Sequence, residues 1–141
     1  MFLKKHGRDV LHNGYNLYPV GHRTKGIYED GWQNSRATSE LLDRWQKDQP
    51  TAGISIITGA VVAVDVDVYD ADTSNELVTL AFEMLGDTIR RVGQKPKALL
   101  VYRVSEPVAK ATTSFFATGS DKRSRVEILG RGQQFVAFNI H

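Results

Sequence analysis

The segment 61–68 constrains the fold more than any other part of the chain. It reads VVAVDVDV, so it is rich in β-branched residues and alternates valine with aspartate over its second half. Because side chains alternate faces along a β-strand, the valines of that half point into a core while Asp65 and Asp67 lie together on the opposite face. The apolar run at 54–64 precedes the pair, so we expect the pair at the end of a buried strand.

Length and composition exclude several classes of protein. The 141 residues suit one domain, or two small lobes that share a core. The absence of cysteine excludes a disulfide framework, cysteine-ligated zinc and a thiol nucleophile. No apolar run approaches the roughly 20 residues of a membrane span, and the N-terminus lacks the apolar segment of a signal peptide. We therefore expect a cytoplasmic protein without a membrane partner.

Charge is divided unevenly along the chain. Residues 1–87 contain 8 Lys or Arg and 13 Asp or Glu, a net charge of −5, and residues 88–141 contain 10 and 3, a net charge of +7. Such asymmetry suggests a site that handles ions, although two differently solvated faces would give the same counts.

Hydrophobic periodicity predicts an α+β fold with largely antiparallel sheets. The helices are expected at 2–12, 38–48 and 73–85, and the strands at 15–20, 53–58, 61–68, 89–92, 98–104, 112–117, 125–129 and 134–140. Thr73 and Glu76 match a capping box at the start of the third helix. Only Gly59-Ala60 separates two of the strands, which predicts a tight hairpin there.

The acidic pair suggests a metal site. Two neighbouring carboxylates on a rigid strand repel each other, and a cation between them relieves the repulsion, because Mg²⁺ and Mn²⁺ prefer oxygen ligands. Glu127 lies between two apolar residues of another strand and could be a third ligand. Two metal ions about 3.5–4 Å apart are a standard device for displacement at phosphorus. An aspartate pair of this kind also occurs on the solvated face of edge strands and alone supports metal binding only weakly, but the preceding apolar run favours the metal site. Glu127 could equally be a surface residue of its strand.

Basic residues surround the predicted acidic site in the sequence. Those on or near the adjacent strands are Arg90, Arg91, Lys95, Lys97 and Arg103. Arginine and lysine pair with phosphate oxygens, and alternation along a strand places Arg103 on the face of Lys97. Each could be a solvated surface charge, but the group fits an anionic, metal-bridged substrate.

Further motifs accompany these residues in a definite order. They are Pro19, Lys25 and Trp32, a helix with Trp45, Gly53-Ile54 and Thr58-Gly59 before 61–67, then Val126-Glu127-Ile128-Leu129-Gly130, the segment 132–136 and His141. This order resembles the bifunctional DNA primase/polymerase (prim-pol) domain of the archaeo-eukaryotic primase superfamily, which occurs in replication proteins of phages, plasmids and other mobile elements. The resemblance covers most of the chain.

The resemblance implies a fold and a set of functional residues. The fold would be an RRM-like catalytic sheet with flanking helices, joined to a smaller αβ unit, over residues 1–141. Asp65, Asp67 and Glu127 would be the catalytic carboxylates and would bind two divalent metal ions, Mg²⁺ or Mn²⁺. Many members carry a histidine between the acidic motifs, where this chain has a Pro-Lys variant with Lys97 as the phosphate contact. The further residues expected to bind nucleotide are Arg103, Lys95, Arg91 and His141.

The expected function is template-directed transfer of nucleotides from (d)NTPs to a 3′-hydroxyl, in the replication of a phage or mobile element. Its partners would be a DNA template and primer, the nucleotide, and a helicase, fused or in trans. It would act in the cytoplasm, which is the host's if a phage encodes it. Because the last strand ends at His141 without a closing turn, we expect a fragment truncated at its C-terminus.

Two other functions remain open from the sequence. A replication domain that only binds nucleotide or nucleic acid would explain the missing histidine and the basic second half. A phosphotransferase of the haloacid-dehalogenase type, with Asp65 as nucleophile, is a weaker match, because the position where that family needs a hydroxyl holds Val68-Tyr69. A D-x-D sugar-nucleotide transferase matches as weakly.

Overall fold

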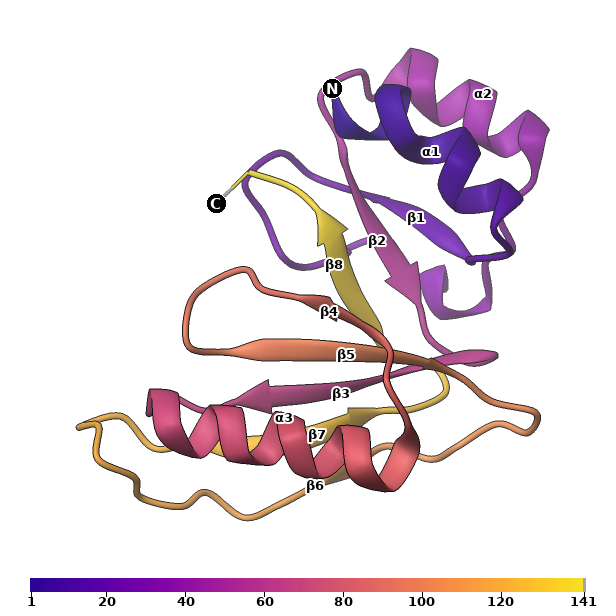
Figure 1. Cartoon of the computed structure of the whole chain (residues 1–141). Coiled ribbons are helices and arrows are strands. Elements are labelled where there is room, and N and C mark those ends of the chain that lie inside the picture. Colours follow the sequence, from indigo (N-terminus) through magenta and orange to yellow (C-terminus); the bar gives the residue numbers. More distant parts are fainter. Residues whose placement is uncertain (141) are drawn as a thin grey trace. The chain divides into compact units, whose positions relative to one another are not determined.

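The chain builds two antiparallel sheets, each in its own unit (Figure 1). The computed structural model describes residues 1–140. The first unit combines residues 1–58 with 132–140, and the second runs from Gly59 to Arg131. Every strand pair is antiparallel, so the predicted α+β class is confirmed.

The first unit has a three-stranded sheet with two helices. Its elements are α1 (Phe2–His12), β1 (Leu17–Val20), the short 3-10 helix η1 (Trp32–Asn34), α2 (Ser39–Asp48), β2 (Gly53–Ile57) and β8 (Gln134–Phe138). The strand order is β1-β2-β8, and all five residues of the central strand β2 are buried. Helix α1 contacts α2, β1 and β2 (Figure 1), with Leu3 and Leu42 fully buried. The Thr38 hydroxyl caps α2 by accepting the Leu41 N–H at 3.2 Å.

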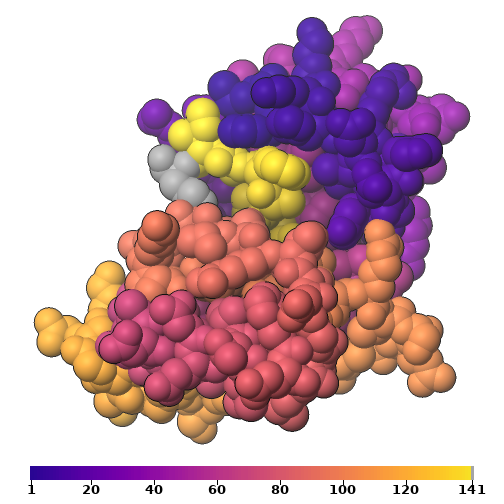
Figure 2. All heavy atoms as spheres, in the orientation of Figure 1, coloured from indigo at the N-terminus to yellow at the C-terminus, as the bar shows by residue number. Residues whose placement is uncertain are grey.

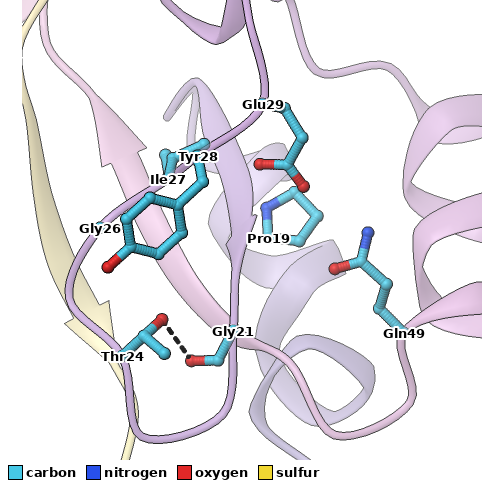
Figure 3. Close-up of a pocket in the computed structure, with 8 residues that line it drawn as sticks. All are labelled: Pro19, Gly21, Thr24, Gly26, Ile27, Tyr28, Glu29 and Gln49. Atoms are coloured by element: carbon cyan, nitrogen blue, oxygen red, sulfur yellow. Dashed lines mark hydrogen bonds between the residues drawn. The ribbon is translucent and has the colours of Figure 1, made fainter.

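The first unit also contains a hollow of about 350 Å³ beside the end of β1 (Figure 3). It is lined by Pro19, Gly21, Thr24, Gly26, Ile27, Tyr28, Glu29 and Gln49. The side chains of Glu29 and Gln49 point toward the ring of Pro19 (Figure 3). None of the predicted site residues within 1–140 lines this hollow.

The second unit places a helix on one face of a five-stranded sheet. Its elements are β3 (Val61–Asp67), α3 (Ala71–Leu85), β4 (Ile89–Arg91), β5 (Ala98–Arg103), β6 (Ala111–Thr112) and β7 (Arg125–Leu129), with the sheet order β4-β5-β3-β7-β6. Helix α3 runs along one face of this sheet (Figure 1). The buried core of that face consists of Val66, Val68, Val78, Ala98 and Leu100. Val64 and Val66 of β3 therefore face α3, which leaves Asp65 and Asp67 for the other face.

The outer side of α3 lies at the molecular surface (Figure 2) and exposes Leu80, Met84 and Leu85. Within residues 1–140, no helix is both long enough and apolar enough to cross a membrane.

The predicted hairpin at Gly59-Ala60 is wrong. Strand β2 pairs with β1 and β8, whereas β3 pairs with β5 and β7, so the two runs belong to different sheets. The Thr58 N–H donates to the Gln133 carbonyl at 2.9 Å, and the Gly132 N–H donates to the Thr58 carbonyl at 3.1 Å. The end of β2 is therefore fixed to the segment that enters β8. In the sequence, two apolar runs separated by two residues look like a hairpin. The prediction failed because each run pairs with strands that are distant in the sequence.

The start of α3 also differs from the prediction, because Asp70 is its N-cap. The Asp70 carboxylate accepts the Thr73 N–H at 2.9 Å and the Thr73 hydroxyl at 2.6 Å, and these hydrogen bonds lower the pKa of Asp70. Thr73 is therefore the third residue of the helix, and the predicted capping box with Glu76 does not form. A charged acceptor is a strong partner for an unpaired N–H at a helix N-terminus.

Several strands are shorter than predicted. The expected strand 112–117 is reduced to the two residues of β6 and an isolated bridge between Phe116 and Ser124. The first strand begins at Leu17 instead of position 15, and the last ends at Phe138 instead of position 140.

Gly53 tests the packing of β2 against β8. A Cβ at Gly53 would lie 2.4 Å from the Phe138 carbonyl oxygen, so Gly53→Ala should lower the free energy of unfolding by about 1–3 kcal/mol. The matched control is Gly59→Ala, whose added methyl meets no atom within 4 Å and should change stability by less than about 0.5 kcal/mol. Urea unfolding of both variants measures the difference, and equal stabilities would contradict this close approach.

Candidate active site

Strand pairing brings two acids and a base into one row across the second unit's sheet. Asp65 on β3 lies opposite Glu127 on β7 and opposite Leu99 on β5, and Leu99 lies opposite Arg91 on β4. Directly paired residues point to the same side of a sheet, so this row faces away from α3. Asp67, two residues further along β3, shares that face. Because β3 is the central strand, a solvated edge strand no longer explains the two aspartates.

Asp65 lies in an unfavourable electrostatic environment. Burial raises the pKa of its carboxyl, and the negative charges of Asp67 and Glu127 raise it further. The positive charges of Arg91 and Lys97 act in the opposite direction, but the net pKa shift is upward. Ionisation of Asp65 is therefore unfavourable in the folded chain, and a cation bound beside its carboxylate would stabilise the ionised form.

Lys97 neutralises Asp67 and rests on an aromatic ring. Its ammonium lies 2.8 Å from a carboxylate oxygen of Asp67 and 4.1 Å from the centre of the Tyr69 ring. Burial alone would lower the pKa of Lys97, but its interactions with Asp67 and Tyr69 outweigh burial and raise the pKa. A second ammonium, that of Lys122, lies 5.0 Å from the same ring. At the end of β3, Lys97 thus has a carboxylate partner in Asp67 and an aromatic partner in Tyr69.

Glu127 is held by two cations that the sequence did not point to. Its buried carboxylate accepts Arg125 Nη2 at 2.9 Å, and Lys110 Nζ lies at 3.4 Å. The guanidinium of Arg125 lies 4.9 Å from the centre of the Phe115 ring. Arg125 could have been found, because it lies two residues before Glu127 on one strand and so shares its face. Nothing in the sequence signals the approach of Lys110 from the loop before β6.

The remaining predicted residues lie away from the carboxylate row or outside the described chain. Arg103 pairs with Val61 at the other end of β5, four residues from Leu99, which is roughly 13 Å along a strand. Arg90 pairs with the core residue Leu100, so it points to the α3 side. Lys95 is exposed, before β5 and next to a cis bond to Pro96. His141 lies outside the described residues.

The donor set suits hard divalent cations, since three carboxylates on adjacent strands supply the oxygen ligands that Mg²⁺ and Mn²⁺ prefer. As the side chains lie, no group of three or more His, Asp or Glu in the described chain is arranged to hold a metal ion. Asp67 and Glu127 face Lys97 and Arg125 instead. A metal ion would therefore have to exchange with these two cations.

The raised pKa of Asp65 predicts how stability depends on pH. A carboxyl whose pKa is higher in the folded state destabilises that state when it ionises, and this penalty grows as pH rises through the two pKa values. Without divalent metal, Asp65→Asn should therefore unfold at a higher urea concentration than the wild type at pH 7. The gain should vanish below about pH 4, where the wild-type carboxyl is protonated.

The control for this experiment is Asp121→Asn, which removes an exposed carboxylate from the same unit. It should leave the urea midpoint nearly unchanged at both pH values. A lower midpoint for Asp65→Asn at pH 7 would contradict the electrostatic picture.

A comparison with known protein families identifies the family of this chain. The model of a family described as bifunctional DNA primase/polymerase, N-terminal, matches residues 8–139, which include the carboxylate row and the cations around it. A comparison with curated proteins finds no matching relative. Because the match covers nearly the whole chain, the protein belongs to the bifunctional DNA primase/polymerase N-terminal (Prim-Pol) family.

Proposed function

We propose that this domain is a DNA-directed nucleotidyltransferase that joins (d)NTPs to a 3′-hydroxyl under the direction of a DNA template. The observation that carries the proposal is the pairing of Asp65 with Glu127 on adjacent central strands, beside Asp67, in a chain of the primase/polymerase family. This arrangement gathers three carboxylates and several phosphate-binding cations on one face of a rigid sheet. Metal-dependent phosphoryl transfer uses carboxylates to hold the metal ions and cations to stabilise the charge on the phosphates.

The three carboxylates would hold two divalent metal ions, Mg²⁺ or Mn²⁺. Such ions, when bound, favour ionisation of the attacking hydroxyl and neutralise charge on the triphosphate. Burial and carboxylate repulsion at Asp65 support this assignment, because they make the site more stable with added positive charge. Lys97, Arg91 and Arg125 would bind the phosphates, with Arg91 in the same row as Asp65.

The charge of the second unit suits a polyanionic substrate once the proposed metal ions are bound. Residues 59–131 contain 10 Lys or Arg and 10 Asp or Glu, so their net charge is zero. Two divalent ions would bring it to +4. Contacts to the template would then be made mainly to phosphates, and binding should weaken as salt rises.

A second function, nucleotide or nucleic-acid binding without catalysis, is favoured by one observation. Lys97 and Arg125 already neutralise two of the three carboxylates, so the folded site does not require metal for charge balance. The segment 91–97 also lacks the histidine that many prim-pol domains carry there.

Nucleotide incorporation tests the catalytic proposal. Asp65→Asn and Glu127→Gln keep the size of each side chain but remove its charge, so each should lower kcat about 100-fold to 1,000-fold, the scale seen when a catalytic electrostatic contact is lost. A primer-extension assay with labelled primer, either metal, and dNTPs or NTPs measures this. The control Asp121→Asn should retain wild-type activity. Full activity in both site variants would overturn the proposal.

Calorimetry separates catalysis from simple binding. Titration of a dNTP with and without Mg²⁺ should show tighter binding with the metal, and Asp65→Asn should remove that difference. A wild-type domain that binds triphosphate equally well without Mg²⁺, and that incorporates no nucleotide, would establish the binding-only function.

A further inference from the structure

Two site carboxylates, Asp67 and Glu127, each belong to a similar group of three side chains: a carboxylate, a cation and an aromatic ring. Asp67 pairs with Lys97 at 2.8 Å, and the Lys97 ammonium lies 4.1 Å from the centre of the Tyr69 ring. Glu127 pairs with Arg125 at 2.9 Å, and the Arg125 guanidinium lies 4.9 Å from the centre of the Phe115 ring. In each case one cation has a carboxylate on one side and an aromatic face on the other. The two arrangements come from different segments of the second unit.

Each cation therefore has two kinds of partner. A metal ion would bind the carboxylate in place of the cation, but it would not bind the aromatic ring. A divalent cation binds carboxylate oxygens but has no comparable affinity for a phenyl or phenol ring in water. The ring attracts the lysine or arginine through its quadrupole without neutralising the positive charge. A cation held by a ring thus keeps its full charge for an incoming anion, whereas one held by another carboxylate would not.

We propose that Tyr69 and Phe115 are positioning residues that keep Lys97 and Arg125 at the site after divalent metal has taken Asp67 and Glu127. The two cations then pass from the carboxylates to the phosphates of the bound triphosphate. This inference rests on the proposed function, because it assumes that the carboxylates bind metal and that the substrate is a triphosphate.

The partial burial of these side chains makes such retention effective. The side chains of Lys97 and Arg125 are 25% and 35% exposed, so water competes only in part for their charge. Cation–π contacts gain strength as they lose solvent. Without the rings, two bound metal ions would repel both cations, and long flexible side chains would move into solvent.

Lysine-ammonium NMR tests the proposal without any need for catalysis. Protons above an aromatic face are shifted upfield, so the ammonium signal of Lys97 should be shifted in the metal-free protein and should stay shifted after saturation with MgCl₂. Tyr69→Leu should remove the shift in both states, and Tyr69→Phe should keep it. Loss of the upfield shift in the wild type when Mg²⁺ is added would overturn the proposal.

Binding of inorganic triphosphate in the presence of Mg²⁺ gives a second, energetic readout. Tyr69→Leu should weaken binding about threefold to tenfold, the scale of a partly desolvated cation–π contact. Phe115 is 53% exposed, so Phe115→Leu should weaken binding about twofold to fivefold. The ring-preserving variants Tyr69→Phe and Phe115→Tyr should restore most of the affinity. In a Lys97→Met, Lys122→Met background, Tyr69→Leu should have no further effect, because both ammonium groups that lie over the ring are then absent.

A purely structural role for the rings predicts a different pattern. Tyr69→Leu would then weaken binding by the same factor in the wild type and in the Lys97→Met, Lys122→Met background, and that result would overturn the proposal. The matched control is Tyr102→Leu, which removes a ring from the α3 side of the same sheet. It should lower the urea midpoint but leave triphosphate affinity unchanged, which separates stability from positioning.

The outcomes also distinguish this inference from the proposed function. If the wild type binds triphosphate with the pattern above but incorporates no nucleotide, the catalytic proposal fails and the positioning role stands. If the wild type polymerises but Tyr69→Leu and Phe115→Leu leave KM for the nucleotide unchanged, catalysis stands and the positioning role fails. A wild type that binds no triphosphate would overturn both.

Discussion

Repulsion among three carboxylates on a rigid sheet is the interaction on which the rest of the site depends. Asp65 and Glu127 are direct partners across two central strands, so neither can move away without breaking the pairing. Burial of Asp65 and repulsion from the neighbouring carboxylates together raise its pKa. Positive charge must therefore come from elsewhere in the chain or from bound ions. The positions of Arg91, Lys97 and Arg125 follow from that requirement.

The apolar core on the opposite face sets the geometry of this acidic face. Val64 and Val66 pack toward α3, while Asp65 and Asp67 alternate with them along β3. A slip of one residue in the pairing would bury both aspartates under the helix and expose both valines, so the core strongly specifies the register. Stability and function thus depend on the same alternation of valine and aspartate along β3. No further structural element is needed to hold the acids in place.

This alternation also explains how much of the site could be predicted from the sequence. It identified the face of the aspartates and of Glu127, because face is a local property with a period of two. It could not identify partner strands, since pairing depends on contacts between distant residues. The supposed hairpin at Gly59-Ala60 failed for that reason. The helix start failed more locally, because Asp70 was a stronger cap than the predicted Thr73.

Predicting the cations was harder, because long side chains reach across strands. Lys97 was found from its closeness to the acidic motifs, and Arg125 could have been found by extending the alternation from Glu127. Tyr69 could also have been found, because it lies two residues beyond Asp67. Lys110 and Phe115 could not, since the irregular segments between β5 and β7 bring them to the site. Arg103 shows the opposite error, because a shared face did not bring it near the carboxylate row.

The two carboxylate–cation pairs differ in how readily they should exchange. Asp67 has one cation partner, and its side chain is 28% exposed, whereas Glu127 has two cation partners and is only 8% exposed. Opening the Asp67 pair therefore costs less, because water and an entering ion can reach it and only one contact has to break. Asp67, next to the destabilised Asp65, thus forms the more accessible side of the site. Lys110 and Arg125 neutralise Glu127 until a bound metal ion supplies the positive charge instead. The fold therefore tolerates three adjacent carboxylates before any ion binds.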